Sequence, residues 1–496
     1  MHKFNFYIIT SIWLFNRCGP DQFGDSLESN QLELNDGFEQ SSNTLPIPGH
    51  WYSNERVIIS ENGYFAPPEG KSFALLESEG IMTRTITSLD TEKSYKFNIW
   101  ARSLNERGNN GTTKLRMIIR NGDEIITSQV WQVDVPTLNG VAESIPNDDG
   151  ANVWIDGPYR HQFADEHIYQ NIDQHPIHDP WQLITGSGYN EAQGQGLGFA
   201  VGNIITPYNR LMYGTDYDDV SDEPYSSILL SAADAQGKPD YNWTQPVTIL
   251  SHTGSEFPWV LDAHLYYDSD TDRLWMSWGG GVCYVTEMNP RTGLFLTEVE
   301  ETEFYTHPEE MHVPVATWSA TKSGWCGDDW SSCWMEGAAL YKNNGHWYFF
   351  GSYGDLGTNY TIRMGRGNSP QGPFYDKEGI ELMAFDLERS TFGNTMLLGD
   401  EGSRMVPGHP HIWEENGQHF LGYDYRRPSD VEEMDYMGIR MIYWFDGWPT
   451  IWQPLQIELD EEIIESNHVE SLTIEFINVG DRGTKVGLDA FEIKSF

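Results

Sequence analysis

Three acidic residues and one histidine stand at the starts of successive aromatic, strand-like segments. They are Asp179 (Ile-His-Asp-Pro), Asp262 (Trp-Val-Leu-Asp-Ala), Glu336 (Trp-Met-Glu-Gly-Ala) and His409 (Val-Pro-Gly-His-Pro). Successive members lie roughly 75 to 85 residues apart, which places them on different repeats of the chain. Two Asp and one Glu that meet at one point suit general acid–base catalysis without a metal or cofactor, because such chemistry needs a protonated carboxyl group and an ionised one.

Each of these residues also has a structural explanation. An aspartate before proline, such as Asp179, is common in turns. Asp262 is compatible with a cap at the end of a strand, and His409 with a hydrogen-bonded histidine in a channel. Glu336 is flanked by apolar residues, where an unpaired buried glutamate is rare. These four residues, taken together in their order along the chain, therefore favour a catalytic site more strongly than any one of them does alone.

The segments that position these residues repeat one pattern between residues 150 and 454. An apolar strand, a turn containing Asn, Asp or Gly, and an aromatic strand recur at residues 263–278, 339–350 and 411–422. Hairpins repeated at this scale over about 300 residues predict a β-propeller of about five four-stranded blades. The innermost strands of a propeller line its channel, so residues at their starts converge at one end.

The two ends of the chain predict a second, antiparallel domain. Short alternating runs fill residues 31–145, but the closing strands of a sandwich appear only in residues 455–496, where Ser471–Asn478 alternates cleanly. We therefore expect an all-β chain in which one β-sandwich is split by the propeller, since the ends of an inserted domain usually lie close together. The alternative is that the C-terminal strands pack on the propeller instead.

Composition limits the partners. A formal charge of −44 over 496 residues argues against nucleic acid and anionic membranes as partners, because binding to a phosphate backbone depends on Lys and Arg.

The four cysteines do not have the spacing of zinc ligands. Cys326 and Cys333 are suitably spaced for a disulfide in an oxidising compartment.

The N-terminus predicts export. A basic start and the apolar residues 4–15 fit a signal peptide over residues 1–17, and the apolar run is too short to span a bilayer. We expect a secreted, periplasmic or cell-surface protein without a membrane span. Cys18 is a candidate for a lipid anchor, although Asn16-Arg17 is a poor context for that processing.

Residues 175–450 resemble family 43 of the glycoside hydrolases, especially its arabinanase branch. Six motifs in the expected order carry the resemblance: His178-Asp179-Pro180, Leu261-Asp262-Ala263, Glu336–Lys342, Tyr360–Arg366 with Ser369–Phe374, Pro407-Gly408-His409 and Trp444–Pro449. The resemblance implies a five-bladed propeller, and segments of residues 31–145 are similar to the jelly-roll, carbohydrate-binding-like modules of such enzymes. One departure is Ala263, where the arabinanases usually have proline.

The resemblance also implies roles. Asp179 is then the general base, Glu336 the general acid, and Asp262 the carboxylate that tunes and orients the acid. A hydrolase of this kind inverts the anomeric centre, with the base and the acid on opposite faces of the sugar. His409 is expected on the propeller axis, where related enzymes hold calcium or water. A further structural Ca²⁺ is expected in the sandwich, where Glu39 and Asp489 would meet.

The expected partner is a plant or algal polysaccharide or oligosaccharide. Substrate contacts are assigned to Trp259, His178, Tyr360 and Trp334, because flat rings stack on sugar faces. The best-supported activity is that of an α-L-arabinofuranosidase or endo-arabinanase. Two alternatives stay open: hydrolysis of a marine galactan or another algal glycan, and a non-catalytic glycan-binding propeller. The sequence leaves endo or exo action and oligomeric state undecided.

Overall fold

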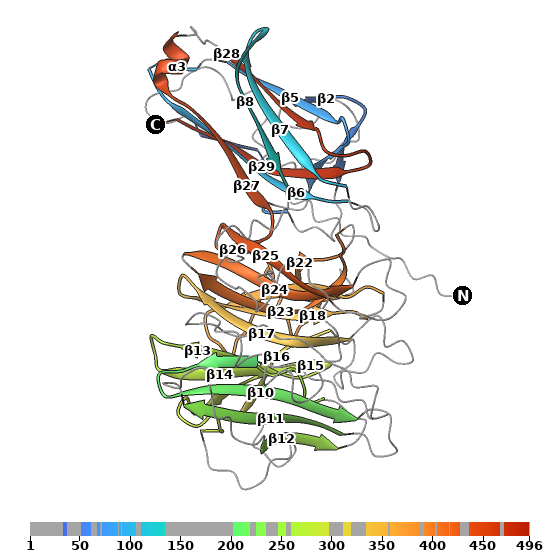
Figure 1. Ribbon diagram of the computed structural model, residues 1–496, viewed down its shortest axis with the longest axis vertical. Helices are drawn as coiled ribbons and strands as arrows, with labels where there is room; N and C mark the ends of the chain where they lie inside the picture. The colour runs from blue at the N-terminus through green and yellow to red at the C-terminus, as the bar shows by residue number, and fades with distance from the viewer. Residues whose placement is uncertain are drawn as a thin grey trace, which may run out of the picture.

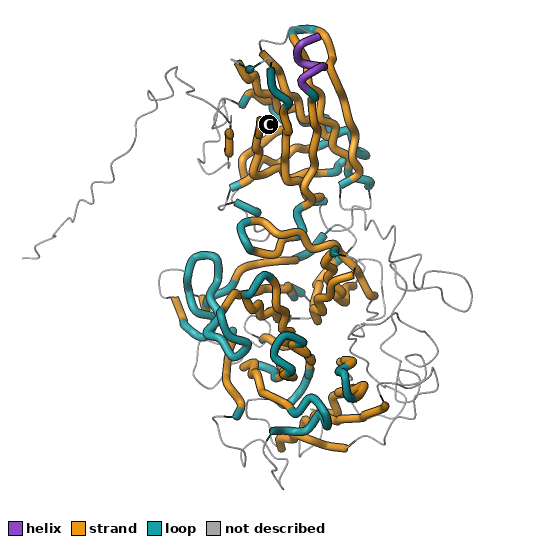
Figure 2. Tube along the Cα trace, turned by 90° about the vertical axis from the view of Figure 1, so that its left-hand side faces the viewer, coloured by secondary structure: helices purple, strands orange, loops and turns teal. Residues whose placement is uncertain are grey.

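The computed structural model of the chain is almost entirely β. It describes residues 33–36, 51–60, 67–69, 72–87, 89–90, 92–105, 111–133, 202–218, 225–234, 247–253, 259–296, 311–318, 334–355, 358–386, 391–401, 404–415, 417–426, 436–466 and 471–495. Within these ranges the one helix is α3 (Glu461–Ser466), which lies at the end of the molecule away from the propeller (Figure 2). No helix in this part of the chain has the length and apolar character needed to cross a membrane.

Four antiparallel sheets of four strands each follow one another between residues 202 and 450 (Figure 1). In chain order the strands are β9 (Gly202–Ile205), β10 (Asn209–Asp218), β11 (Tyr225–Asp234) and β12 (Val247–Thr253); β13 (His264–Asp268), β14 (Arg273–Trp278), β15 (Val282–Met288) and β16 (His312–Thr317); β17 (Met335–Asn343), β18 (His346–Tyr353), β19 (Thr361–Gly367) and β22 (Thr395–Leu398); and β23 (Met405–Glu415), β24 (Gln418–Arg426), β25 (Tyr436–Phe445) and β26 (Trp448–Thr450). A two-stranded hairpin of β20 (Phe385–Asp386) and β21 (Thr391–Phe392) lies between β19 and β22.

These sheets are the blades of a β-propeller. In each sheet the first strand along the chain is an edge strand, and β13 packs on β9, β17 on β13, and β23 on β17. Strands β9, β13, β17 and β23 are therefore the inner strands of successive blades. The all-β propeller class predicted from the repeats is confirmed. The residues expected to supply a fifth blade, before Gly202, lie outside the described ranges.

Turn chemistry explains two of the tight hairpins. Asn343 pairs with His346, and the two residues between them, Asn344 and Gly345, have φ of 49° and 80°. The Asp446-Gly447 turn between β25 and β26 has φ of 48° and 72°. Asn-Gly and Asp-Gly are the pairs that adopt this left-handed conformation at low cost, and its twist matches that of the flanking strands.

Aromatic side chains fill the space between blades. Tyr266 of the second blade meets Trp347 of the third edge to face, with ring centroids 5.1 Å apart. Trp275, Trp278 and Trp347 are all at most 5% exposed. These three tryptophans therefore belong to the packing of the blades.

A β-sandwich of two sheets contains strands from both ends of the described chain. One sheet has the order β27-β6-β29-β4-β3, with β1 also paired to β29, and the other has the order β2-β5-β28-β7-β8. The strands are β1 (Glu33–Asp36), β2 (Tyr52–Ser53), β3 (Val57–Ser60), β4 (Phe73–Glu77), β5 (Ile81–Thr87), β6 (Tyr95–Ser103), β7 (Lys114–Asn121), β8 (Glu124–Gln132), β27 (Gln453–Leu459), β28 (Ser471–Asn478) and β29 (Lys485–Ser495).

Strand β28, from the C-terminal part of the chain, pairs with two strands from the N-terminal part. It lies between β5 and β7, so that Ile474 is opposite Arg84 on one side and Ile119 on the other. Its residues alternate between partly exposed and buried along its whole length, as the sequence pattern predicted. Leu472, Ile474 and Phe476 thereby enter the sandwich core.

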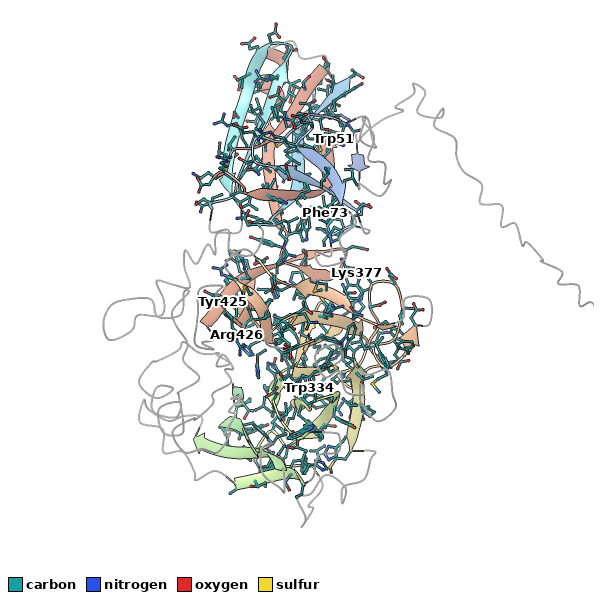
Figure 3. All side chains as sticks on the ribbon, turned by 90° about the vertical axis from the view of Figure 1, so that its right-hand side faces the viewer. Trp51, Phe73, Trp334, Lys377, Tyr425 and Arg426 are labelled. Atoms are coloured by element: carbon teal, nitrogen blue, oxygen red, sulfur yellow. The ribbon has the colours of Figure 1, made fainter. Side chains whose placement is uncertain are left out.

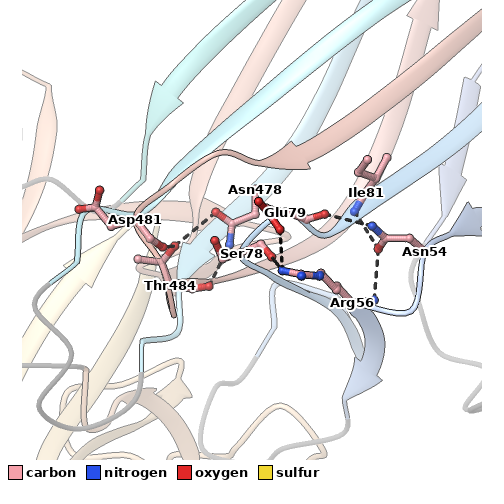
Figure 4. Close-up of polar contacts among 8 residues, drawn as sticks. All are labelled: Asn54, Arg56, Ser78, Glu79, Ile81, Asn478, Asp481 and Thr484. Carbon is pink, nitrogen blue, oxygen red and sulfur yellow. Dashed lines mark hydrogen bonds and ion pairs between the residues drawn. The ribbon is translucent and has the colours of Figure 1, made fainter.

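Hydrogen bonds and an ion pair connect the turns at one edge of the sandwich (Figure 4). Asn54 accepts hydrogen bonds from the backbone N–H of Arg56 and Ile81 and donates to the carbonyl of Glu79. Arg56 forms an ion pair with Glu79, which has a φ of 66°. From the C-terminal half, Asn478 exchanges backbone hydrogen bonds with this turn. The turn between β4 and β5 is therefore held from both ends of the chain.

The sandwich and the propeller share a buried ionic contact. The guanidinium of Arg102, on β6, lies 2.7 Å from the carboxylate of Glu401 in the last blade, and Arg440 on β25 binds the same carboxylate. Burial alone would raise the pKa of Glu401, but the charges of Arg440, Arg102 and Arg404 lower it. Aromatic contacts also join the two domains, including Trp100 on β6 against Tyr443 on β25. Phe73, which packs on Trp452, lies at the end of the sandwich nearest the propeller (Figure 3).

Replacing Glu401 by glutamine is expected to destabilise the whole chain. The substitution removes the negative charge that the buried guanidinium groups of Arg102 and Arg440 share. Breaking a buried ion pair in this way typically costs about 3–5 kcal/mol. Thermal or urea unfolding measures the change. As a matched control, Glu287→Gln removes the partner of the half-exposed Arg273 and is expected to cost less than about 1 kcal/mol. Equal losses in the two variants would contradict a special role for the buried contact.

Candidate active site

Three of the residues singled out in the sequence come from three successive blades. Asp262 lies two residues before β13, Glu336 is the second residue of β17, and His409 lies in β23. Because β13, β17 and β23 pack on one another as inner strands, these side chains gather at the centre of the propeller. Asp179, His178 and Glu39 lie outside the described residues.

Asp262 and Glu336 are joined through the backbone between their blades. The Oδ2 atom of Asp262 accepts a hydrogen bond of 3.1 Å from the N–H of Gly337, the residue after Glu336. Asp262 adopts a φ of 55°, which is unusual for a residue other than glycine and costs free energy. The residue before it, Leu261, is fixed because its carbonyl accepts from Gly279 N–H at 2.8 Å. The second blade thus presents this carboxyl group directly to the third.

A β-bulge in β17 follows Glu336 and sets the direction of its side chain. The regular pairing with β18 is interrupted between Glu336 and Ala339, and Gly337 there has a φ of 61°. A Cβ atom on Gly337 would lie 2.7 Å from Ser352 Oγ and 3.2 Å from His409 Cα, so only glycine fits this close approach. The Glu-Gly pair is therefore required by the packing of two blades.

Two side chains donate hydrogen bonds to the Glu336 carboxyl group. The hydroxyl of Tyr360 lies 2.6 Å from Glu336 Oε1. The indole of Trp334 makes the second hydrogen bond. Figure 3 shows Trp334 within the propeller, and a Cβ atom on Gly280 would lie 2.9 Å from its ring. Trp334 is partly exposed, whereas Tyr360 is 2% exposed.

The pKa values of both carboxyl groups are raised to near neutral pH. Burial raises the pKa of Asp262 to about 7, against the smaller effect of the Gly337 hydrogen bond. Burial also raises the pKa of Glu336 to about 7, and the charge of Asp262 adds to the increase. The hydrogen bonds from Tyr360 and Trp334 and the charge of His409 oppose it. Two adjacent acids near neutrality are suited to keep one proton available for transfer.

His409 is fixed beside this pair. Its φ is 49°, and its backbone N–H donates a 2.7 Å hydrogen bond to Ser352 Oγ. Two further histidines lie close by, with His264 Nε2 and His411 Nδ1 2.8 Å apart. Burial lowers the pKa of His411 to about 3, so its imidazole is neutral.

The described side chains near His409 do not fit calcium. Ca²⁺ prefers six to eight oxygen ligands, whereas imidazoles gather here. Within the described ranges no group of three or more His, Cys, Asp and Glu side chains is arranged to hold a metal. The axial Ca²⁺ expected from the resemblance receives no support from these residues and stays a prediction.

Asp489, the other predicted calcium ligand, is fully buried in the sandwich. Its Oδ2 atom accepts a 2.8 Å hydrogen bond from the N–H of Glu69. A cation from the propeller reaches the same region, since Lys377 Nζ lies 3.3 Å from the carbonyls of Pro67 and Pro68 and is influenced by the charge of Asp489. Calcium between Glu39 and Asp489 stays a prediction.

The aromatic residues expected to contact substrate are mostly covered. Trp259 is 8% exposed and forms backbone hydrogen bonds with Gly280, while the ring of Tyr360 packs on Gly408. Their predicted sugar contacts stay predictions. Trp334 keeps partial exposure beside Glu336.

Two residues of the site were missed in the sequence. Ser352, on β18, links His409 to the neighbourhood of Glu336, and nothing in its local sequence marks it. Cys283 is a buried free thiol whose pKa is raised by burial and by the charges of Asp262 and Glu336. Cys326 and Cys333 lie outside the described residues.

Comparison with known proteins shows which family the propeller is similar to. Residues 211–449 match the family model described as glycosyl hydrolases family 43. The chain is 26% identical over 225 residues to extracellular endo-alpha-(1->5)-L-arabinanase 2 of Bacillus subtilis, covering 40% of this chain and 43% of that protein. It is 26% identical over 220 residues to an extracellular endo-alpha-(1->5)-L-arabinanase of Thermotoga petrophila, covering 38% and 40%. The matches thus span less than half the length of these relatives.

Solved structures give weaker likenesses. An exo-1,5-alpha-L-arabinanase from a bovine ruminal metagenomic library aligns with a TM-score of 0.41 and 16% identity, covering 51% of this chain and 77% of that chain. The alpha-L-arabinanase of Cellvibrio cellulosa also gives 0.41, with 17% identity and coverage of 55% and 81%. The likeness to the family therefore rests on the sequence matches. Residues 211–449 of this chain are similar to glycosyl hydrolases family 43.

Proposed function

We propose that the chain is an inverting glycoside hydrolase of arabinan, with Glu336 as its general acid. The observation that carries the proposal is the pair formed by Asp262 and Glu336, both with pKa values of about 7, at the meeting point of three blades. An acid that donates to a departing oxygen must be protonated near neutral pH. A neighbouring carboxyl group and burial are the two standard means of keeping it so.

In the proposed reaction Glu336 gives its proton to the glycosidic oxygen as the bond to the anomeric carbon breaks. A water molecule attacks that carbon from the opposite face, and its proton passes to the base, assigned to Asp179. The new bond forms opposite the one that breaks, so the anomeric configuration inverts. Asp262 raises the pKa of the acid and binds Gly337 N–H, which fixes the turn carrying Glu336. The reaction needs no cofactor.

Arabinan is proposed because of the printed activities of the relatives, which are named 1,5-alpha-L-arabinanases and arabinosidases. Two of them are named extracellular, which supports the proposed export of this chain with residues 1–17 as a signal peptide. Ala263 directly follows Asp262, at a position where arabinanases usually have proline. Because of this difference, other pentose polysaccharides and algal galactans are also tested as substrates.

A substrate screen tests the proposal. Purified protein is incubated with linear arabinan, arabinoxylan and algal galactans, and reducing sugars are measured. Proton NMR then follows the anomer that appears first. Release of arabino-oligosaccharides or arabinose with inverted configuration is expected. Turnover of galactan alone would replace the substrate, retention of configuration would reject the mechanism, and no turnover of any glycan would favour a binding protein.

A further inference from the structure

We infer that Tyr360 is a positioning residue that, together with Ser352, fixes the orientation of the proposed acid Glu336. The inference rests on the proposed function of Glu336 and deepens it. Tyr360 was expected from the sequence to face the substrate. Its burial and its hydrogen bonds give it a different task.

The three side chains form a hydrogen-bonded chain across two blades. The backbone N–H of His409 donates to Ser352 Oγ at 2.7 Å, the Ser352 hydroxyl bonds to the hydroxyl of Tyr360, and Tyr360 donates to Glu336 Oε1 at 2.6 Å. Ser352 is fully buried and Tyr360 is 2% exposed. Because the serine oxygen already accepts from an N–H, its own proton is free to point at Tyr360, and consecutive bonds of this kind strengthen one another.

The direction of the last bond determines how the acid can act. Glu336 Oε1 accepts from Tyr360, so Oε1 serves as the carbonyl-type oxygen of the protonated acid. The proton to be transferred is therefore carried by Oε2. Without the Tyr360 hydroxyl, the hydrogen bond from Trp334 is left to hold the carboxyl group. The carboxyl group can then place its proton away from the departing oxygen, and a misplacement of about 1 Å costs rate strongly.

Close packing keeps the chain in place. A Cβ atom on Gly408 would lie 2.1 Å from a ring carbon of Tyr360, and a Cβ atom on Gly337 would lie 2.7 Å from Ser352 Oγ. Gly408 lets the fourth blade pack directly on the ring of Tyr360, and Gly337 leaves room for Ser352 within the third blade. The ring of Tyr360 is thereby almost fully covered.

Leaving-group dependence distinguishes positioning of the acid from a merely structural role. Aryl α-L-arabino-oligosaccharides with phenols of graded acidity, together with linear arabinan, are hydrolysed by wild type and by Tyr360→Phe. A 2,4-dinitrophenol departs without protonation, whereas a sugar does not. We expect kcat for arabinan to fall about 10- to 100-fold, and that for the dinitrophenyl substrate to change about 3-fold or less. Ser352→Ala is expected to show the same selectivity with a smaller loss.

Tyr348→Phe is the matched control. Tyr348 is also a buried tyrosine of the third blade, but its hydroxyl donates to the carbonyl of Gly447. This variant is expected to show no dependence on the leaving group, and thermal unfolding checks that all variants are folded. A loss in Tyr360→Phe that is equal for every leaving group would overturn the inference. If Glu336→Gln also shows no leaving-group dependence, the proposed acid itself is rejected. If Glu336→Gln shows it and Tyr360→Phe does not, only the role of Tyr360 fails.

Discussion

Glu336→Gln is expected to lower kcat on linear arabinan by about 10²- to 10⁴-fold, the range that a general acid contributes. Glutamine keeps the size of the side chain and can still accept the hydrogen bond from Tyr360, but it has no proton of suitable acidity to give. The departing sugar oxygen must then leave as an alkoxide. Initial rates on arabinan with KM determined separately measure the loss, and KM is expected to change little because the group acts in the transition state.

A good leaving group should restore the activity of this variant. On a dinitrophenyl arabino-oligosaccharide, Glu336→Gln is expected to approach the wild-type rate, because the phenolate leaves without protonation. Glu287→Gln, a substitution of the same type in the outer part of the second blade, serves as the control and is expected to retain activity. Full activity of Glu336→Gln on arabinan would end the assignment of Glu336 as acid.

Asp262→Asn is expected to move the pH dependence of activity toward acid. In the wild-type protein, Glu336 has a pKa of about 7, raised first by burial and then by the charge of Asp262. Activity therefore falls as the pH rises through about 7, because the acid loses its proton. Asparagine removes the neighbouring negative charge, so the pKa of Glu336 falls and the alkaline limb of kcat/KM moves to lower pH.

A fall of about one unit in the pKa of Glu336 lowers kcat/KM of Asp262→Asn at pH 7 by about 5-fold, because the protonated fraction of Glu336 falls from about a half to about a tenth. Part of the loss should be recovered by lowering the pH. A full pH profile between about pH 4 and 9 separates this cause from damage to the fold. The amide oxygen of asparagine can still accept from Gly337 N–H, so the backbone contact is retained. If the alkaline limb of the kcat/KM profile of Asp262→Asn stays at the same pH while the maximum of the profile falls, Asp262 acts through its contacts and not through its charge.

Local patterns in the sequence predicted the elements of the fold for a physical reason. Alternation in Ser471–Asn478 specifies a half-buried strand by itself, because successive side chains point to opposite faces. The Asn344-Gly345 pair specifies its turn, because few other residues adopt positive φ at low cost. Repetition of such hairpins was sufficient to predict a propeller, whereas the roles that the ordered motifs assign to Asp262 and Glu336 stay predictions.

The hydrogen bonds that give the site its chemistry depend on contacts between distant segments. Tyr360 lies 24 residues from Glu336, and Ser352 lies 57 from His409. The contact of the sandwich with the propeller joins Arg102 to Glu401 across 299 residues.

The sequence by itself therefore determined that the chain is built of β-hairpins, because periodicity and turn conformation are local properties. Only the tertiary structure decided that Tyr360 donates to Glu336 and that Ser352 binds the backbone of His409. The direction of a side chain and the burial that shifts a pKa are set by neighbouring blades, which no single segment of sequence contains.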